Sequence, residues 1–317
     1  MNSSPAAAFP SPPDFLQARA CPCCGSVSEA AALSSIPPGE ELPWADLEKS
    51  WRGFFKRKVF LSYRRCPDCG LLYAPLYFND AALGRLYGSM GDNGAGLDRT
   101  LLERTQRGYF DFLRRHADLK GDYFELGPDI GLFTQLVAQA GAARALWLYE
   151  PNTAVHPELA SRVRGQLRIH SEMTDFSAVP DGSIDTCVMI HVLDHLPDAR
   201  RLLRDLRRKL TARGRILIVT HDERSLLAQG LGHCWPAYCL QHSQLFNRDS
   251  TRRFLAACDL EVIETRQSVN FFPATYLLKH LLFALGLRGI SAKLRGDSFA
   301  LPLRLGNIMT VARPRPS

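Results

Sequence analysis

Residues 123–140 read YFELGPDIGLFTQLVAQA, a run that changes from strand-like to helix-like across two glycines. Tyr123 to Leu126 is a short apolar run typical of a strand, and residues 127–131 form a glycine-containing turn. The next run, Leu132 to Ala140, predicts a helix that Gly141 closes. A strand that passes through glycines into a helix N-terminus brings bare backbone close to a ligand, as nucleotide cofactors require.

A carboxylate follows at the end of the next predicted strand. Ala145 to Tyr149 predicts that strand, and Glu150 comes directly after it, nineteen residues beyond Gly131. A carboxylate at this place accepts hydrogen bonds from both hydroxyls of an adenosine ribose. The glycine turn and Glu150 together predict a site for a cofactor that contains a nucleoside.

The alternation of strand and helix continues to the end of the chain. Further strands are expected at 167–170, 184–190, 216–220, 261–265 and 308–312. Further helices are expected at 101–116, in the arginine-rich run that starts at Arg200, and at 251–257. Strands that alternate with helices imply a mostly parallel sheet covered on both faces. The predicted fold class is therefore α/β and doubly wound, with seven strands.

The spacing of the turn distinguishes between two kinds of cofactor. The dinucleotide fingerprint Gly-x-Gly-x-x-Gly, counted from Gly127, fails at Asp129 and Leu132. The turn instead resembles that of class I S-adenosylmethionine-dependent methyltransferases, whose motif is an acidic residue, x, then Gly-x-Gly-x-Gly. Glu125, Gly127 and Gly131 fit this motif, and Asp129 replaces the middle glycine.

Later segments carry the same resemblance. Residues 180–185 (PDGSID) and 191–196 (HVLDHL) are similar to the family's segments before and after its fourth strand. The likeness covers nearly the whole chain from Cys21 onward. It implies a Rossmann-like methyltransferase fold, S-adenosylmethionine as the cofactor, and a small-molecule acceptor such as a sugar nucleotide or a natural-product or cell-envelope intermediate.

The resemblance also assigns cofactor contacts to individual positions. Asp129 would face the methionine part, where its carboxylate either repels the cofactor's carboxylate or engages its ammonium. Glu150 would hold the ribose, with a plain surface acid as the alternative, and Glu125 has turn bracing as its alternative. The predicted cofactor-binding set is Glu125, Gly127, Asp129, Gly131, Glu150, Glu172, Met173 and His191, with Glu172 and Met173 at the adenine and Asp175 as a substitute there.

Three histidines are candidates for catalysis. Methyl transfer depends mainly on positioning, and a base is needed only where the acceptor must lose a proton. His191, His195 and His242 are the candidate bases because imidazole titrates near neutral pH. The alternatives are that His195 braces its loop and that His242 bonds to loop backbone. A metal site on these histidines is not expected, because they lie in separate loops with no carboxylate at ligand spacing.

Two Cys-x-x-Cys-Gly knuckles precede the cofactor motif. Cys21, Cys24, Cys66 and Cys69 predict a closed tetrahedral site for a structural Zn²⁺, with Cys23 as a rival to Cys21. Free or disulfide-bonded cysteines are the alternative. The cysteines are spaced for a metal ion, and residues 1–14 lack the features of a signal peptide. Both observations predict a location in the reducing cytoplasm.

The predicted organisation has four parts. They are a flexible tail at 1–14, a zinc-binding module at 15–80, a linker at 81–100, and a methyltransferase domain at 101–317. The aromatic-rich insertion between the knuckles is expected to pack as its own element. Residues 271–287 predict a lid or packing helix, since a proline, charges and short length argue against a membrane span. An interfacial contact with a membrane stays open.

The net charge of +7 raises the question of an anionic partner. Much of the excess lies in the arginine-rich helix, which lacks the interleaved aromatic residues of a base-stacking surface, so nucleic acid is not the expected partner. Two alternatives to a small-molecule methyltransferase remain. One is a macromolecule methyltransferase that docks through the zinc module and the basic helix. The other is a binding or scaffold protein that lost turnover, which Asp129 suggests.

Overall fold

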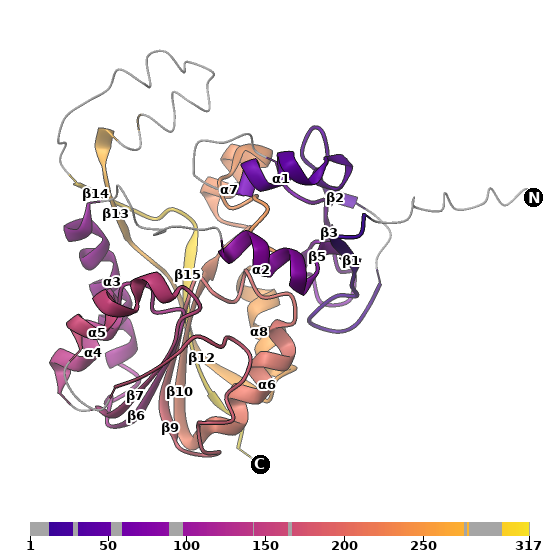
Figure 1. Ribbon diagram of the computed structural model, residues 1–317. Coiled ribbons are helices and arrows are strands. Elements are labelled where there is room, and N and C mark those ends of the chain that lie inside the picture. The colour runs from indigo at the N-terminus through magenta and orange to yellow at the C-terminus, as the bar shows by residue number, and fades with distance from the viewer. Residues whose placement is uncertain are drawn as a thin grey trace, which may run out of the picture.

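The computed structural model describes residues 13–27, 31–51, 59–88, 98–141, 143–163, 167–275, 278 and 300–316. A large sheet carries helices on both faces, and a smaller N-terminal part lies over one end of that sheet (Figure 1). Most of the predicted tail, residues 1–12, and the part of the aromatic insertion at 52–58 lie outside the described residues.

Seven strands form the large sheet in the order β12-β15-β10-β9-β6-β7-β8. Their bounds are β6 Gly121–Leu126, β7 Ala143–Tyr149, β8 Leu167–His170, β9 Ile184–Ile190, β10 Leu210–His221, β12 Leu260–Gln267 and β15 Asn307–Pro314. The strands from β10 to β8 run parallel, whereas β15 is antiparallel to both β10 and β12. The predicted doubly wound, mostly parallel fold is confirmed.

Helices cover both faces because the central strands are apolar on both sides. Their bounds are α3 Arg99–Arg114, α4 Leu132–Ala140, α5 His156–Arg162, α6 Ala199–Lys209 and α8 Arg248–Ala256. Val188 of β9 packs in the cluster that contains α3, α4 and α5 residues. Its neighbours Cys187 and Met189 pack with α6 and α8 on the other face. This alternation explains why β9 reads as a continuous apolar run.

The N-terminal part is built from short elements. Their bounds are β1 Leu16–Ala18, β2 Ala31–Leu33, η1 Gly39–Glu41, α1 Trp44–Trp51, β3 Tyr63–Arg65, β4 Leu72–Tyr73, β5 Leu76–Phe78 and α2 Asp80–Gly88. Trp51, Phe60 and Phe78 are buried in its apolar core. As predicted, the insertion between the knuckles packs as its own element over the described part, α1.

A loop of the large domain completes this small module. After β10 the chain forms α7 Leu226–Leu231, η3 Gly232–Cys234 and β11 Gln244–Leu245, and β11 pairs antiparallel with β4. Trp235 and Tyr238, which precede β11, are buried in the module's apolar core. The module and the loop after β10 therefore form one packed unit.

The segment predicted as a linker differs from that expectation. Its first part is helix α2, whose Ala82 and Leu86 are buried in the module core. Asp98 caps α3 by accepting a hydrogen bond from the backbone N–H of Thr100, while residues 89–97 lie outside the described residues. The glycines of this region suggested a loose connection, but the apolar residues of α2 pack into the core of the module.

Two arginines of the module bind the loops of the large domain. The Arg19 guanidinium donates to the carbonyl oxygens of Pro197 at 2.9 Å and Ser243 at 2.6 Å, and burial lowers its pKa to about 10. Arg65 donates to both carboxylate oxygens of Glu223, each at 2.9 Å. Bidentate pairing of this kind fixes orientation as well as distance.

The segment predicted as a lid helix begins as a strand. β13 Asn270–Pro273 pairs with β14 Ala300–Leu303, and most of residues 276–299 lie outside the described residues. The expectation of a helix from residue 271 is wrong at its start, because Phe271 and Phe272 join this hairpin. Within the described ranges, no helix combines the length and apolarity that a bilayer span requires.

Candidate functional site

The turn between β6 and α4 holds three residues at positive φ. Gly127 has φ 70°, Asp129 has φ 53° and Gly131 has φ 82°. Asp129 thus adopts the left-handed conformation that glycine favours, and aspartate is among the few other residues that tolerate it. At Gly131 a Cβ atom would lie 2.5 Å from a methyl group of Leu159. The turn keeps the backbone conformation of a glycine motif despite the substitution at Asp129.

Glu150 points toward this turn from the end of β7. The residue is 6% exposed. One carboxylate oxygen accepts the backbone N–H of Asp129 at 2.8 Å, and the other accepts that of Asn152 at 2.9 Å. Burial raises the pKa of Glu150, and the two backbone N–H groups oppose that rise. The structure brings together the two features that the sequence placed in one site.

Glu125 lies beneath the turn and braces it. A single carboxylate oxygen accepts the hydroxyls of Tyr123 at 2.7 Å and Thr134 at 2.6 Å. Burial raises the pKa of Glu125 to about 7, against the effect of the two hydroxyl donors. The contact with Thr134 ties β6 to α4 across the glycine turn.

The residues predicted near adenine follow β8. Glu172 is exposed, and Met173 is half-buried against the core cluster that contains Tyr149 and Phe176. The backbone N–H of Glu150 donates to the carbonyl of His170 at 2.8 Å, which holds the start of this segment beside Glu150.

Four histidines cluster at the carboxyl ends of β9 and β10. Successive ring centroids are 4.7 Å apart from His191 to His221, from His221 to His242, and from His242 to His195. The sequence predicted three of these residues and missed His221, the last residue of β10. Its position at a strand end was the available signal, because ligands of α/β sheets bind at that edge.

Asp194, also missed as a site residue, lies at the centre of this cluster. It is fully buried, and one carboxylate oxygen lies 2.7 Å from Nδ1 of His221 and accepts that residue's backbone N–H at 3.0 Å. The other oxygen, Oδ1, is buried and has no hydrogen-bond partner among the described residues, and the same holds for Nδ1 of His191.

These contacts correct one expectation. A metal site on the histidines was not expected, because they lie in separate loops and no carboxylate was recognised at ligand spacing. The premise about the carboxylate is wrong. Asp194 follows His191 by three residues, and donor atoms of His191, Asp194 and His221 all lie within 4.8 Å of one another.

His242 and His195 occupy the module side of the cluster. Nδ1 of His242 lies 2.6 Å from the carbonyl of Ala237 and 3.4 Å from the thiol of Cys239, so the predicted bond to loop backbone is present. Burial would lower the pKa of His242, but Cys239 and other acceptors raise it to about 9. Nδ1 of His195 lies 3.2 Å from the hydroxyl of Tyr87 in α2, and burial with the neighbouring imidazoles holds the pKa of His195 well below its usual value.

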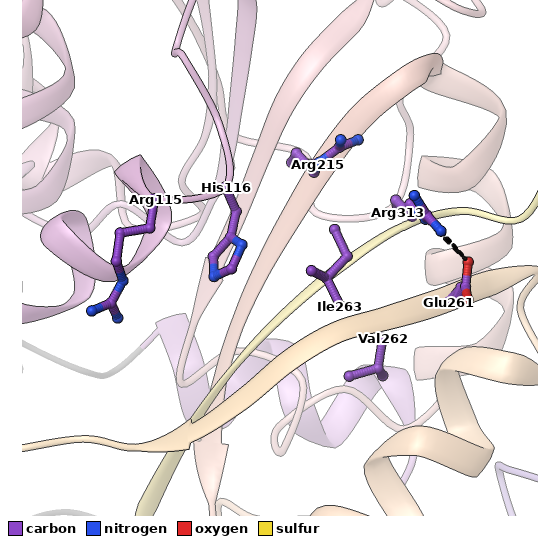
Figure 2. A pocket seen from close by; sticks show the side chains of 7 residues that line it. All are labelled: Arg115, His116, Arg215, Glu261, Val262, Ile263 and Arg313. Atoms are coloured by element: carbon purple, nitrogen blue, oxygen red, sulfur yellow. Dashed lines mark hydrogen bonds and ion pairs between the residues drawn. The ribbon is translucent and has the colours of Figure 1, made fainter.

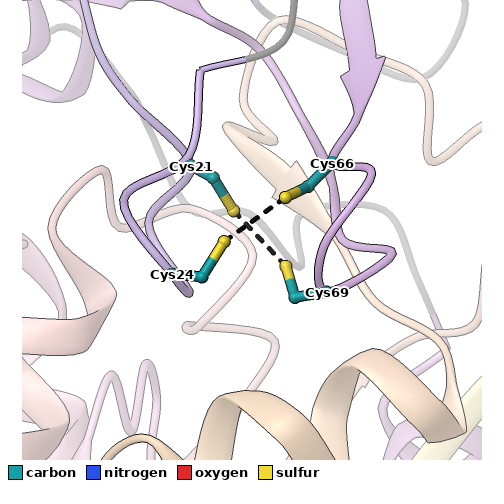
Figure 3. A group of neighbouring side chains, drawn as sticks. All are labelled: Cys21, Cys24, Cys66 and Cys69. Carbon is teal, nitrogen blue, oxygen red and sulfur yellow. Dashed lines mark hydrogen bonds between the residues drawn. The ribbon is translucent and has the colours of Figure 1, made fainter.

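The knuckle cysteines face one another across a small gap (Figure 3). The sulfurs of Cys21 and Cys69 are 3.5 Å apart and those of Cys24 and Cys66 are 3.3 Å apart, and all four lie within 4.8 Å. Cys23 is buried but stands outside this group of four. None of the nine cysteines forms a disulfide. Four thiols in this arrangement suit a tetrahedral Zn²⁺.

A separate hollow of about 450 Å³ lies at the other end of the sheet. Figure 2 shows side chains around it from the end of α3, the start of β10, β12 and the end of β15. Arg313 lies near the end of β15, which runs antiparallel to β10, so the hollow is at the edge opposite the histidine cluster. It contains none of the predicted site residues, and Glu261 partly neutralises its arginines through Arg313.

Comparisons with known proteins agree with this arrangement. Residues 101–265, just over half of the chain, match a sequence model described as a methyltransferase domain. No curated protein matches the chain in sequence. A chain from the complex of the Haloferax volcanii Trm112 methyltransferase activator with a protein described as a methyltransferase is similar in structure, at 13% identity and a TM-score of 0.52 over 72% of this chain and 100% of that one.

A second similar structure carries ligands. It is the Burkholderia thailandensis 1,6-didemethyltoxoflavin-N1-methyltransferase with bound 1,6-didemethyltoxoflavin and S-adenosylhomocysteine. The two chains share 16% identity and a TM-score of 0.51 over 80% of this chain and 99% of that one. At such low identity, these likenesses establish the fold.

Proposed function

The chain belongs to the methyltransferase-domain family, and from this membership we propose that it transfers a methyl group from S-adenosylmethionine to a small-molecule acceptor. The observation that carries the proposal is the buried Glu150 carboxylate held against the Asp129 backbone at the carboxyl edge of the sheet. The ligands of the toxoflavin methyltransferase support both the choice of cofactor and a small acceptor.

The residues of the turn suit this cofactor. A Cβ atom at Gly127 would lie 2.7 Å from a methyl group of Val192, so the turn is closely packed without side chains. We assign Gly127, Asp129 and Gly131 to the methionine part, with Glu125 bracing them from beneath. Glu150 holds the ribose, since a carboxylate that accepts two backbone N–H groups has acceptor capacity left for hydroxyls.

The remaining cofactor contacts follow from position. Glu172 and Met173 lie just after β8, whose end is bonded to Glu150, and we assign them to the adenine side. His191 directly follows β9. Its neighbour Val192 packs against Gly127 of the turn, and its own ring contacts that of His221 in the histidine cluster. When bound, S-adenosylmethionine supplies an activated methyl group, so the protein has to align the acceptor and exclude water.

We assign His242 and His195 as the candidate general bases for an acceptor that loses a proton. Because the pKa of His242 is raised to about 9, its unprotonated, base-competent fraction is small at neutral pH and grows as the pH rises toward 9. The two rings are in edge contact, and each is oriented by a fixed partner, Ala237 for His242 and Tyr87 for His195. Both partners belong to the module or its completing loop. The module therefore shapes the acceptor side of the site, and we propose that it governs acceptor choice.

The four knuckle cysteines hold a structural Zn²⁺ in this proposal. Backbone N–H groups of Gly25 and Gly70 donate to the carbonyls of Cys21 and Cys66, at 2.8 and 2.9 Å, and so form the tight turns that a Cys-x-x-Cys pair needs. Reduced thiolates are required for such a site, which agrees with a cytoplasmic location.

Isothermal calorimetry on the full chain tests the cofactor assignment. We expect S-adenosylmethionine and S-adenosylhomocysteine to bind at one molecule per chain and to raise the melting temperature, because both present the same ribose and adenine to Glu150. NAD is the matched control and is expected to give no signal, since the turn fails the dinucleotide fingerprint. Absence of binding by both sulfur compounds would refute the assignment.

A further inference from the structure

We propose that His191, Asp194 and His221 form a second metal site, separate from the four cysteines, that takes one divalent transition-metal ion such as Zn²⁺. One donor atom from each residue lies within 4.8 Å of the others. Metal–ligand bonds of about 2.0–2.2 Å would draw these atoms slightly closer. His221 is the last residue of β10, and His191 and Asp194 lie in the turn that directly follows β9, the adjacent parallel strand.

Two unpaired buried atoms point to a missing partner. Nδ1 of His191 and Oδ1 of Asp194 are inaccessible to solvent and form no hydrogen bond with any part of the chain that the structure describes. An unpaired buried polar atom costs roughly 1–3 kcal/mol, and such atoms are uncommon in folded proteins. Two of them in one cluster, on two residues that already offer ligand atoms, are explained together by a single ion.

The cluster is held in place before any ion arrives. Asp194 accepts both the backbone N–H of His221, at 3.0 Å, and a contact from that ring at 2.7 Å. The backbone N–H of His191 donates to the carbonyl of Val219 in β10 at 2.9 Å. The backbone φ of His191, 53°, is unusual for a non-glycine residue. Backbone strain of this kind persists only where the surroundings fix it, and it concentrates at functional sites.

The donor set selects the class of ion. Two imidazoles and one carboxylate suit Zn²⁺, Co²⁺ or Fe²⁺, whereas Mg²⁺ and Ca²⁺ prefer oxygen ligands throughout. Three protein ligands leave coordination positions open, as in catalytic rather than structural metal sites. The cysteine site, with four thiolates, has no such opening.

The three ligands lie beside the region where the acceptor is proposed to bind. The ring of His221 contacts that of His242, one of the candidate bases. An ion here would bind an oxygen or nitrogen atom of the acceptor and favour its deprotonated form. This role rests on the proposed methyl transfer, whereas the binding of the ion does not.

Co²⁺ titration of the full chain, purified with Zn²⁺ on the cysteines, tests the site. We expect one further equivalent of Co²⁺ per chain, with weak visible bands and without the intense near-ultraviolet absorption of a thiolate ligand. Metal analysis of the loaded protein should then give two ions per chain. Failure to bind a further equivalent, or a spectrum dominated by thiolate, would overturn the proposal.

Single substitutions locate the ion. His191→Asn and His221→Asn should each weaken Co²⁺ binding by at least tenfold, because each removes a ligand. His233→Asn is the matched control, since His233 is an exposed histidine outside the cluster. Far-ultraviolet circular dichroism of each variant checks folding. Wild-type affinity in both cluster variants would overturn the assignment even if the wild-type chain binds a second ion.

Calorimetry with S-adenosylmethionine separates this proposal from the proposed function. Co²⁺ binding without cofactor binding would leave the metal site standing and remove the methyltransferase assignment. Cofactor binding without a second ion would overturn the metal site and leave the proposed function standing. In that case Asp194 and His221 would form a hydrogen-bonded pair that positions the acceptor without metal.

Discussion

The cofactor side and the histidine side of the site are built in different ways. On the cofactor side, the proposed methionine and ribose contacts come from one continuous strand-turn-helix-strand unit, residues 121–150. The histidine side gathers residues from β9, from the end of β10 and from the loop that completes the module. A site made of consecutive residues is fixed by local structure, whereas the histidine cluster forms only when segments far apart in the sequence come together.

This difference separates two tasks. The cofactor side holds a ligand through backbone groups and one buried carboxylate, Glu150, and it needs no contribution from the module. On the histidine side, Tyr87 and Ala237 orient two of the rings, and both lie in the packed unit of the module. Substitutions on the histidine side should therefore alter turnover, and substitutions on the cofactor side should alter cofactor affinity.

The largest expected effect is on the histidine side. His242→Gln should lower kcat by roughly 10²- to 10⁴-fold, the usual contribution of a general base, while the Kd for S-adenosylmethionine changes by less than about twofold. Turnover would be measured as release of S-adenosylhomocysteine with an acceptor found by screening small molecules. His233→Gln, an exposed histidine, is the control. A loss of cofactor affinity in place of kcat would break the division between the two sides.

An intermediate effect is expected on the cofactor side. Glu150→Ala should weaken S-adenosylmethionine binding roughly 10- to 100-fold, because hydrogen bonds to a charged acceptor are worth about 1.5–3 kcal/mol. Glu261→Ala, at an exposed carboxylate on the opposite edge of the sheet, should change the Kd by less than about threefold. Calorimetry measures both. Equal losses in the two variants would show that burial of Glu150 against the turn is not what holds the cofactor.

The same division explains what the sequence could predict. The bounds of α4, β8 and β9 agree with the predicted runs, because glycine caps and apolar strands are local signals. Asp194 and His221 were missed since nothing in the local pattern says that the ends of two strands will place them together. The helix α2 was missed because its two buried residues have meaning only against the module core, to which residues 235–245 contribute.

The smallest expected effect concerns Asp129, the position where the turn departs from the family motif. Asp129→Gly removes the cost of a left-handed backbone at a non-glycine residue, about 1 kcal/mol. It also raises the conformational entropy of the unfolded chain, which lowers the free energy of unfolding by a similar amount. We therefore expect a nearly unchanged melting temperature and a Kd for S-adenosylmethionine within about threefold of wild type. The reason is that the backbone N–H of Asp129, which contacts Glu150, is retained.

Asp129→Val is the contrasting variant and should lose both stability and affinity, since a β-branched residue is strained at φ 53°. The sign of any change in the glycine variant distinguishes repulsion of the cofactor's carboxylate, which predicts tighter binding, from attraction of its ammonium, which predicts weaker binding. A loss of more than tenfold would mean that this carboxylate, and not the backbone of the turn, dominates the cofactor side.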